Sequence, residues 1–256
     1  MSAWIAFWKK EWMELVRSGK FFILMLVSAL FGIMNPAIAK LTPWLMEAMS
    51  ESLQESGIQV GEVTVDALTS WAQFYKNMPM ALIVAVLIFC GIFTQEYQKG
   101  TLILVLTKGM SRRKVYGVKA LTCLLWWSLY FWMSYGITWL YSGYYWDNGT
   151  VSNILTTAAL FWVFGVWVFC LIVFFSTLCF ETSGVLAGTG MLLLVSYIAG
   201  IFPKVQDYLP TKLLECQALW TESAASADFL PALLVTVAMT TAAGVTGMFA
   251  FDKKKF

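Results

Sequence analysis

Six long, nearly uncharged apolar stretches constrain the fold of this chain more than any other feature. A helix needs roughly 20 residues to cross the hydrocarbon core of a bilayer, and these stretches approach or exceed that length. Hydrophobic residues make up 59% of the chain, charged residues only 12%, and the mean hydropathy is +0.71. This composition excludes a water-soluble globular domain. The predicted spans are residues 21–41, 79–94, 118–141, 154–180, 184–202 and 229–251.

The apolar stretches are continuous and rich in Leu, Val, Ala and Phe. Strands of a transmembrane barrel would instead alternate apolar and polar residues over about ten positions. The sequence therefore predicts an all-α integral membrane protein, with residues 1–256 forming a single transmembrane domain. The first stretch exceeds the length of a signal-peptide core, so we expect it to be retained. Within it, Asn35-Pro36 either bends the helix or ends it.

The distribution of charge predicts the orientation of these spans. The segments on the side of the amino terminus carry thirteen basic and five acidic residues, and those on the other side carry four basic and ten acidic residues. Because Lys and Arg accumulate on the cytoplasmic side of a membrane, we expect both termini to be cytoplasmic. An even number of spans and the closing Lys253, Lys254 and Lys255 agree with this topology.

Residues 1–20 have the pattern of an amphipathic helix that lies in the membrane interface. Trp4, Trp8 and Trp12 recur every four residues, while charged residues fall towards the other side. Such a helix places its aromatic face at the lipid boundary. It serves either as a simple aromatic anchor or as a hinge that connects movement of the spans to a cytoplasmic partner.

The segments on the outer side are short. Residues 42–78 are acidic and could form surface helices over 43–53 and 65–75, and Pro210 could start a short helix in the segment 203–228. The third span is aromatic on more than one face; lipid contact or packing accounts for most of this, and a pathway for an amphipathic substrate is the alternative. Its aromatic residues are Trp126, Trp127, Tyr130, Phe131, Trp132, Tyr135 and Trp139.

The chain lacks the residues that several kinds of chemistry require. It contains no histidine, its five cysteines show no CxxC spacing, and no GxxxxGK[ST] phosphate loop occurs. We therefore expect no catalytic, cofactor-binding or metal-binding residues on this chain. Active transport would need ATP and Mg on a partner subunit. Spans without charged residues in their interiors argue for a hydrophobic or amphipathic cargo.

A short basic segment, EYQKGTLILVLTKGMSRRKVYGVK at residues 96–119, separates the second and third spans and holds six of the seventeen Lys and Arg residues. It resembles the loop after the second span in type-2 permeases of ABC exporters, which has an acid, a GTL, an L-x-T and an S-R pattern. Gly109 stands where that family commonly has proline, which puts the geometry of the loop in doubt. The matching residues are Glu96, Gly100, Thr101, Leu102, Leu104, Leu106, Thr107, Ser111, Arg112 and Arg113.

The resemblance implies that this segment forms a coupling helix that inserts into a nucleotide-binding ATPase subunit. Thr101 could cap such a helix, and residues 102–106 would offer an apolar contact surface. The basic residues that follow would bind acidic groups of the partner or anionic lipid, or only enforce orientation. The family pattern also implies two permeases, a homodimer rather than a heterodimer, with two ATPase subunits.

These observations predict the permease subunit of an ATP-driven exporter in the bacterial plasma (inner) membrane, with no role for nucleic acid. The best candidate cargo is a peptide, followed by drugs or lipid-linked molecules. The alternatives are a non-transport membrane scaffold or assembly protein, an intramembrane enzyme, a passive channel, or an ion or drug exporter of the same family.

Overall fold

The computed structural model describes residues 3–49, 64–220 and 224–254, which fold almost entirely into helices and contain no strand. This agrees with the predicted all-α class. The helices are α1 (Ala3–Arg17), α2 (Lys20–Ala48), α4 (Ala67–Phe89), α5 (Thr94–Lys99), α6 (Thr101–Thr107), α7 (Arg112–Tyr145), α8 (Ile154–Leu178), α9 (Thr182–Ala199), α10 (Pro203–Gln206) and α11 (Leu230–Lys253), with 3-10 turns η1 (Asn148–Thr150), η2 (Pro210–Leu219) and η3 (Ser226–Phe229).

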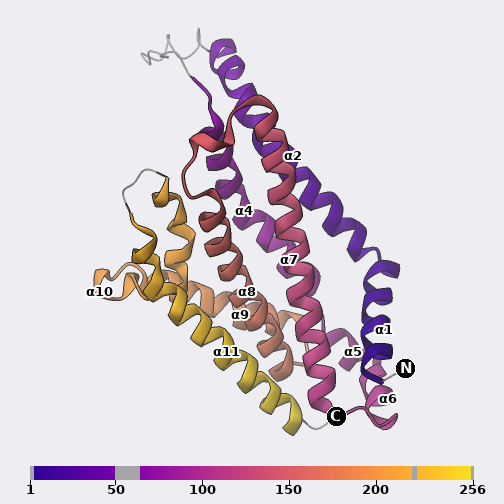
Figure 1. The fold of residues 1–256 in the computed structure, drawn as a ribbon. Helices are drawn as coiled ribbons and strands as arrows, with labels where there is room; N and C mark the ends of the chain where they lie inside the picture. The colour runs from indigo at the N-terminus through magenta and orange to yellow at the C-terminus, as the bar shows by residue number, and fades with distance from the viewer. Residues whose placement is uncertain (1–2, 50–63, 221–223, 255–256) are drawn as a thin grey trace.

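The long helices form an elongated bundle in which both chain ends lie at the same end, beside α5 and α6 (Figure 1). We call this the α6 end. Helix α7 runs through the middle of the bundle and packs against α2, α4 and α8, while α11 packs mainly on α8. Helix α1 meets α2 at a sharp elbow, where Gly19 adopts a φ of 77° that favours glycine.

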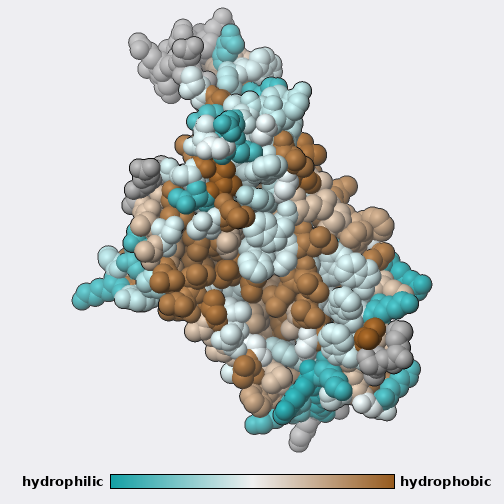
Figure 2. All heavy atoms as spheres, in the orientation of Figure 1, coloured by the Kyte–Doolittle hydropathy of each residue, from teal (hydrophilic) through white to brown (hydrophobic). Residues whose placement is uncertain are grey.

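Five segments in the described part of the chain are long and apolar enough to cross a membrane: Lys20–Ala48, Ala67–Lys99, Ile154–Leu178, Thr182–Ala199 and Ser226–Lys253. The predicted span 118–141 is not among them, although it lies within the 34-residue helix α7. At 1.5 Å per residue, α7 is about 50 Å long and exceeds the thickness of a hydrocarbon core. Its Trp, Tyr and Ser residues lower its hydropathy, and the surface over α7 is correspondingly pale in Figure 2.

Several predicted boundaries shift in the structure. Helix α2 continues through Asn35-Pro36 and Pro43 to Ala48, so the first span does not end at the proline. Helix α4 starts at Ala67, twelve residues before the predicted second span, because the side chain of Asp66 accepts a hydrogen bond from the Thr69 amide and caps the helix.

The two predicted surface helices are therefore extensions of long helices. The first belongs to α2, and residues 50–53 lie outside the described part of the chain, as does Lys255 of the basic tail. The second is the start of α4. At Pro210 the chain forms the predicted short helix, as the ten-residue 3-10 segment η2.

Aromatic side chains fill the centre of the bundle. Trp126, Trp127, Tyr130 and Phe131 of α7 are buried, and the Phe131 ring stacks on Phe161 of α8 with centroids 5.8 Å apart. Ordinary packing therefore accounts for this part of the aromatic third span, whereas Trp139 is 49% exposed. Hydrophobic residues cover much of the outside between more hydrophilic ends (Figure 2).

A close contact between α7 and α8 in this core depends on Gly165 of α8, against which the indole ring of Trp127 of α7 lies. A methyl group at position 165 would overlap the ring, so we expect Gly165→Ala to cost about 1–3 kcal/mol and to lower the unfolding temperature by several degrees, at about 2–4 °C per kcal/mol. A thiol-reactive fluorophore can follow unfolding, because Cys90, Cys123 and Cys216 are buried and free. Gly136→Ala is the control, since nothing lies within 4 Å of a Cβ there; equal unfolding temperatures for the two variants would contradict the prediction.

Candidate functional site

Two short helices, α5 and α6, replace the predicted single coupling helix at the α6 end. They meet at Gly100, which adopts the left-handed conformation with a φ of 65°. This residue is the C-cap of α5 and the N-cap of α6. The prediction that Thr101 caps this helix is wrong, because α6 has Gly100 at its N-cap and no side-chain cap hydrogen bond. Gly109 has a φ of 87°, which proline cannot adopt. This explains the departure from the family pattern at that position.

Helix α6 has one buried face and one exposed face, both apolar. Leu102 is 1% exposed and Leu106 is partly buried, whereas Ile103 and Leu104 are 47% and 62% exposed. Because residues four apart share a helix face, Leu102 and Leu106 hold α6 on the bundle. Leu102 is therefore not free to contact a partner, and the exposed residue that sequence reasoning did not single out is Ile103.

Glu96 of α5 is 4% exposed and lies inside the bundle, so it is not part of the outer surface of the loop. Its carboxylate forms ion pairs with Lys10 of α1 and with Lys119 of α7, the latter at 3.1 Å. Lys119 is 1% exposed and also binds Glu11 of α1, at 3.1 Å, and the carbonyl of Ile92, at 3.0 Å. We call Lys10, Glu11, Glu96 and Lys119 the buried ion cluster; it joins three helices.

Lys10 connects the buried ion cluster to the outer side of α1. It forms ion pairs with Glu11 at 2.9 Å and with Glu14 at 2.8 Å. Burial alone would lower the pKa of Lys10, but the carboxylates of Glu11 and Glu96 outweigh it and raise this pKa above its ordinary value. Burial alone would raise the pKa of the Glu14 carboxyl, yet the hydrogen bond from Lys10 lowers it. Both groups are therefore charged at neutral pH.

Sequence reasoning missed the members of this cluster on α1 and α7. Lys10 and Glu11 are recognisable only as part of the polar side of an amphipathic helix, and Lys119 only as a basic residue of the loop. Carboxylate oxygens of Glu11, Glu14 and Glu96 lie within 4.8 Å of one another, which is close enough for a metal ion. The ammonium groups of Lys10 and Lys119 already bind these three carboxylates, however.

The two arginines of the S-R pattern bind the end of α11. Arg112 donates hydrogen bonds to the carbonyls of Asp252, at 2.9 Å, and Lys254, and the Nε of Arg113 lies 2.6 Å from the Asp252 carboxylate. Cations at a helix C-terminus are favoured by its dipole and by its free carbonyls. Ser111 is exposed and precedes α7 as its N-cap residue. The arginines thus have an intramolecular role that their basic character did not indicate.

The basic tail is attached to the same end of the bundle. The Nζ of Lys254 donates to the carbonyls of Thr177, at 2.8 Å, and Cys179, at 3.2 Å, and lies over the rings of Tyr97 and Phe180. Burial lowers the pKa of Lys254. This residue therefore closes the C-terminal end of α8.

Residues 3–17 form the helix α1 within the predicted segment, and its predicted aromatic face is partly exposed. Trp4 and Trp12 are 41% and 42% exposed, Trp8 is partly buried, and Leu15 packs in the core. The ring of Trp12 lies 4.5 Å from that of Trp126 in α7. Helix α1 is thus held to the bundle by aromatic contacts and by the buried ion cluster.

The sequence of the chain decides its family. The family model described as ABC-2 family transporter protein matches residues 5–219, which is most of the chain. The chain belongs to the ABC-2 transporter family. No curated protein matches it, and no solved structure matches it. An ABC-2 permease is the membrane subunit of an ABC transporter. The residues predicted from the loop therefore lie in a permease. Helix α5 ends its second apolar span, α6 follows that span, and α6 exposes the apolar pair Ile103 and Leu104.

Proposed function

We propose that this permease is the transmembrane subunit of an ATP-driven exporter and that α6 docks on a separate nucleotide-binding subunit. The observation that supports this most strongly is the exposed pair Ile103 and Leu104 on a short helix after the second apolar span of an ABC-2 permease. Apolar side chains exposed at the end of the bundle gain stability when a partner covers them.

The buried ion cluster gives α6 a rigid connection to the spans. Helix α5 contributes Glu96, α1 contributes Lys10 and Glu11, and α7 contributes Lys119. A displacement of α6 would be transmitted through Gly100 to α5, and from α5 through the buried ion cluster to α1 and α7. Helix α1 thereby acts as the hinge rather than only as an aromatic anchor. Glu96 has a positioning role in this proposal, and Leu104 a contact role.

ATP and Mg would bind to the partner, since the permease has no phosphate loop. We propose six spans, with α7 as the third, because α7 is long enough and packs between the apolar helices. The excess of Lys and Arg on the segments at the α6 end supports a topology with both termini in the cytoplasm, which we propose for a bacterial cell. Two permease copies, in a homodimer, would work with two ATPase subunits in the plasma membrane.

The cargo proposed for this exporter is a hydrophobic or amphipathic molecule, with a peptide as the first candidate. The spans carry almost no charge in their interiors, which does not favour a small ion. Polar groups at membrane depth are mainly side-chain amides and hydroxyls, such as the Asn77 carboxamide nitrogen, which donates to the Asn35 carboxamide oxygen at 2.8 Å.

A pull-down of the full-length permease from native membranes, followed by mass spectrometry, tests the function. We expect an ATPase with a phosphate loop to copurify, and reconstitution of both subunits to give ATP-dependent accumulation of a labelled amphipathic peptide. The permease alone should give none. A scaffold or channel would copurify with no ATPase, and accumulation by the isolated permease would contradict the proposal.

The proposed topology makes a separate prediction. A single cysteine introduced at Lys253, in a variant whose five native cysteines are replaced by serine or alanine, should resist a membrane-impermeant maleimide in intact cells and react after lysis. A cysteine at Asn148, in η1 at the opposite end of the bundle, is the matched control and should react in intact cells. The reverse pattern would exclude cytoplasmic termini.

A further inference from the structure

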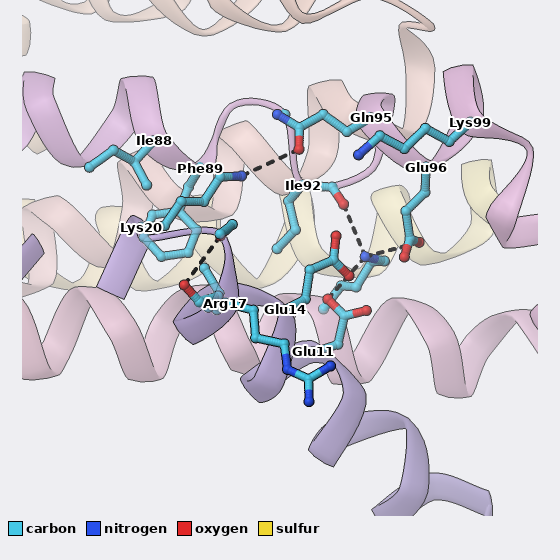
Figure 3. Close-up of a pocket in the computed structure, with 14 residues that line it drawn as sticks. Glu11, Glu14, Arg17, Lys20, Ile88, Phe89, Ile92, Gln95, Glu96 and Lys99 are labelled. Carbon is cyan, nitrogen blue, oxygen red and sulfur yellow. Dashed lines mark hydrogen bonds and ion pairs between the residues drawn. The ribbon is translucent and has the colours of Figure 1, made fainter. Parts of the chain in front are cut away.

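A cavity of about 360 Å³ lies at the elbow between α1 and α2, where these helices approach the end of α4 and α5. Figure 3 shows its lining, with Lys20 and Lys99 on either side of Gln95. Lys20 donates a hydrogen bond to the carboxamide oxygen of Gln95 at 3.3 Å. The contact surface proposed for α6 lies outside this cavity, although Glu11, Glu96 and Lys119 of the buried ion cluster also line it.

The carboxylates in this cavity are already neutralised. Glu11 and Glu96 are bound by Lys10 and Lys119, and Glu14 is bound by Lys10. Any cationic ligand would have to displace these ammonium groups. The cavity therefore does not favour a metal ion or an amine.

Two cations in the cavity have no such partner. Within the described part of the chain, neither Lys20 nor Lys99 forms an ion pair, and both line the cavity on either side of Gln95. The Glu14 carboxylate, which also lines the cavity, is bound by Lys10. Two like charges placed together are unfavourable unless an anion joins them. Arg17 also lines the cavity, but its guanidinium points away from Gln95 in Figure 3.

Most of the remaining wall of the cavity is apolar, and the cavity lies where the polar helix α1 is followed by the apolar helix α2. Leu15, Phe89 and Ile92 belong to the core or pack against it, and Lys20 is the first residue of α2. A ligand in this place would have its anionic group between the lysines and its apolar part along Leu15 of α1 and the end of α4. An anionic phospholipid at the membrane interface has this arrangement, with a charged headgroup next to apolar acyl chains.

We propose that the elbow cavity binds an anionic phospholipid, with its phosphate between Lys20 and Lys99 and the start of its acyl chains against Leu15, Phe89 and Ile92. Gln95 would donate its amide N–H groups to a phosphate oxygen after rotation of its carboxamide. A lipid held there would join the α1–α2 elbow to α5.

The experiment uses the full-length permease, purified with its associated subunits in detergent and titrated with dioctanoyl phosphatidylglycerol by native mass spectrometry. Dioctanoyl phosphatidylcholine and inorganic phosphate are the comparison ligands. We expect dioctanoyl phosphatidylglycerol to bind about tenfold more tightly than dioctanoyl phosphatidylcholine. Inorganic phosphate at the same concentration should not displace the bound phosphatidylglycerol.

Variants of the lysines test whether the preference for phosphatidylglycerol arises in the cavity. Lys20→Gln with Lys99→Gln should remove it, whereas Lys20→Arg with Lys99→Arg should keep it. Lys9→Gln with Lys253→Gln is the matched control, because it removes the same charge from exposed positions that do not line the cavity, and it should also keep the preference. Lys99→Gln alone, at an exposed position, should weaken binding several-fold even if a change at Lys20 prevents folding.

Three results would overturn the proposal. They are equal binding of the two lipids, an unchanged preference in a folded variant that lacks both lysines, and displacement of the lipid by inorganic phosphate. The first two exclude a charge-selective site in the cavity, and the third identifies a site for free anions. None of these results depends on whether an ATPase copurifies, so they are distinct from a failure of the proposed function.

Discussion

Replacing Leu104 by aspartate should abolish copurification of the ATPase subunit while the permease still inserts into the membrane. Leu104 is 62% exposed on a seven-residue helix, and its neighbour Ile103 is 47% exposed. A carboxylate at this position would be buried without a partner when the subunits associate, and an unpaired buried charge costs several kcal/mol. About 3 kcal/mol corresponds to more than a hundredfold loss of affinity. The measurement is the ratio of ATPase to permease in a pull-down.

Gln98→Asp is the control for this substitution. It adds the same charge at an exposed position of the neighbouring α5 and does not alter the apolar pair on α6. We expect it to retain most of the ATPase. Leu102→Asp, by contrast, should lower the yield of folded permease, because Leu102 is 1% exposed. Full retention of the ATPase by Leu104→Asp would show that the subunits meet elsewhere.

Replacing Lys119 by methionine should strongly destabilise the folded permease, because it removes a buried ammonium group. Lys119 is 1% exposed and lies 3.1 Å from both Glu11 and Glu96. Its removal leaves two buried carboxylates with Lys10 as their only ammonium partner among the described residues. Breaking a buried pair in this way costs about 3–5 kcal/mol, which should lower the unfolding temperature by on the order of 10 °C. The buried cysteines again report unfolding through a thiol-reactive fluorophore.

Two further variants separate the loss of the ion pair from other effects. Lys114→Met removes an exposed charge from the first turn of α7 and should change the unfolding temperature little. Combining Lys119→Met with Glu11→Gln and Glu96→Gln should recover part of the stability, since no carboxylate is then left buried without a cation. An unfolding temperature unchanged by Lys119→Met would mean that these groups are hydrated rather than buried.

The spans illustrate what can be predicted from local sequence. Long apolar runs dictate helices in a membrane regardless of their neighbours, and five of the six predicted spans correspond to helices that satisfy length and hydropathy. The third was predicted from its length, but Trp and Tyr residues lower its hydropathy while they fill the core. The hydropathy of a helix depends only on which residues it contains, whereas its packing depends on the shapes of its side chains and of their neighbours.

The loop illustrates what cannot be predicted in this way. The pattern of Gly100, Leu104 and Ser111 located the segment, and its helical character was correct. Which side of α6 is exposed was not predicted, because the answer depends on how α6 rests on the bundle. The same holds for Arg112, whose partners at the end of α11 and just after it are 140 and 142 residues away in the sequence.

The sequence by itself determined the helical membrane fold, the family, and the position of the loop, because each of these follows from residues close together in the chain. Only the tertiary structure decided that Glu96 lies inside and pairs with Lys119 and Lys10, and that Lys20 and Lys99 share a cavity. The physical reason is that charge pairing acts over a few ångströms in space, and these residues are separated by 23 to 86 positions along the chain.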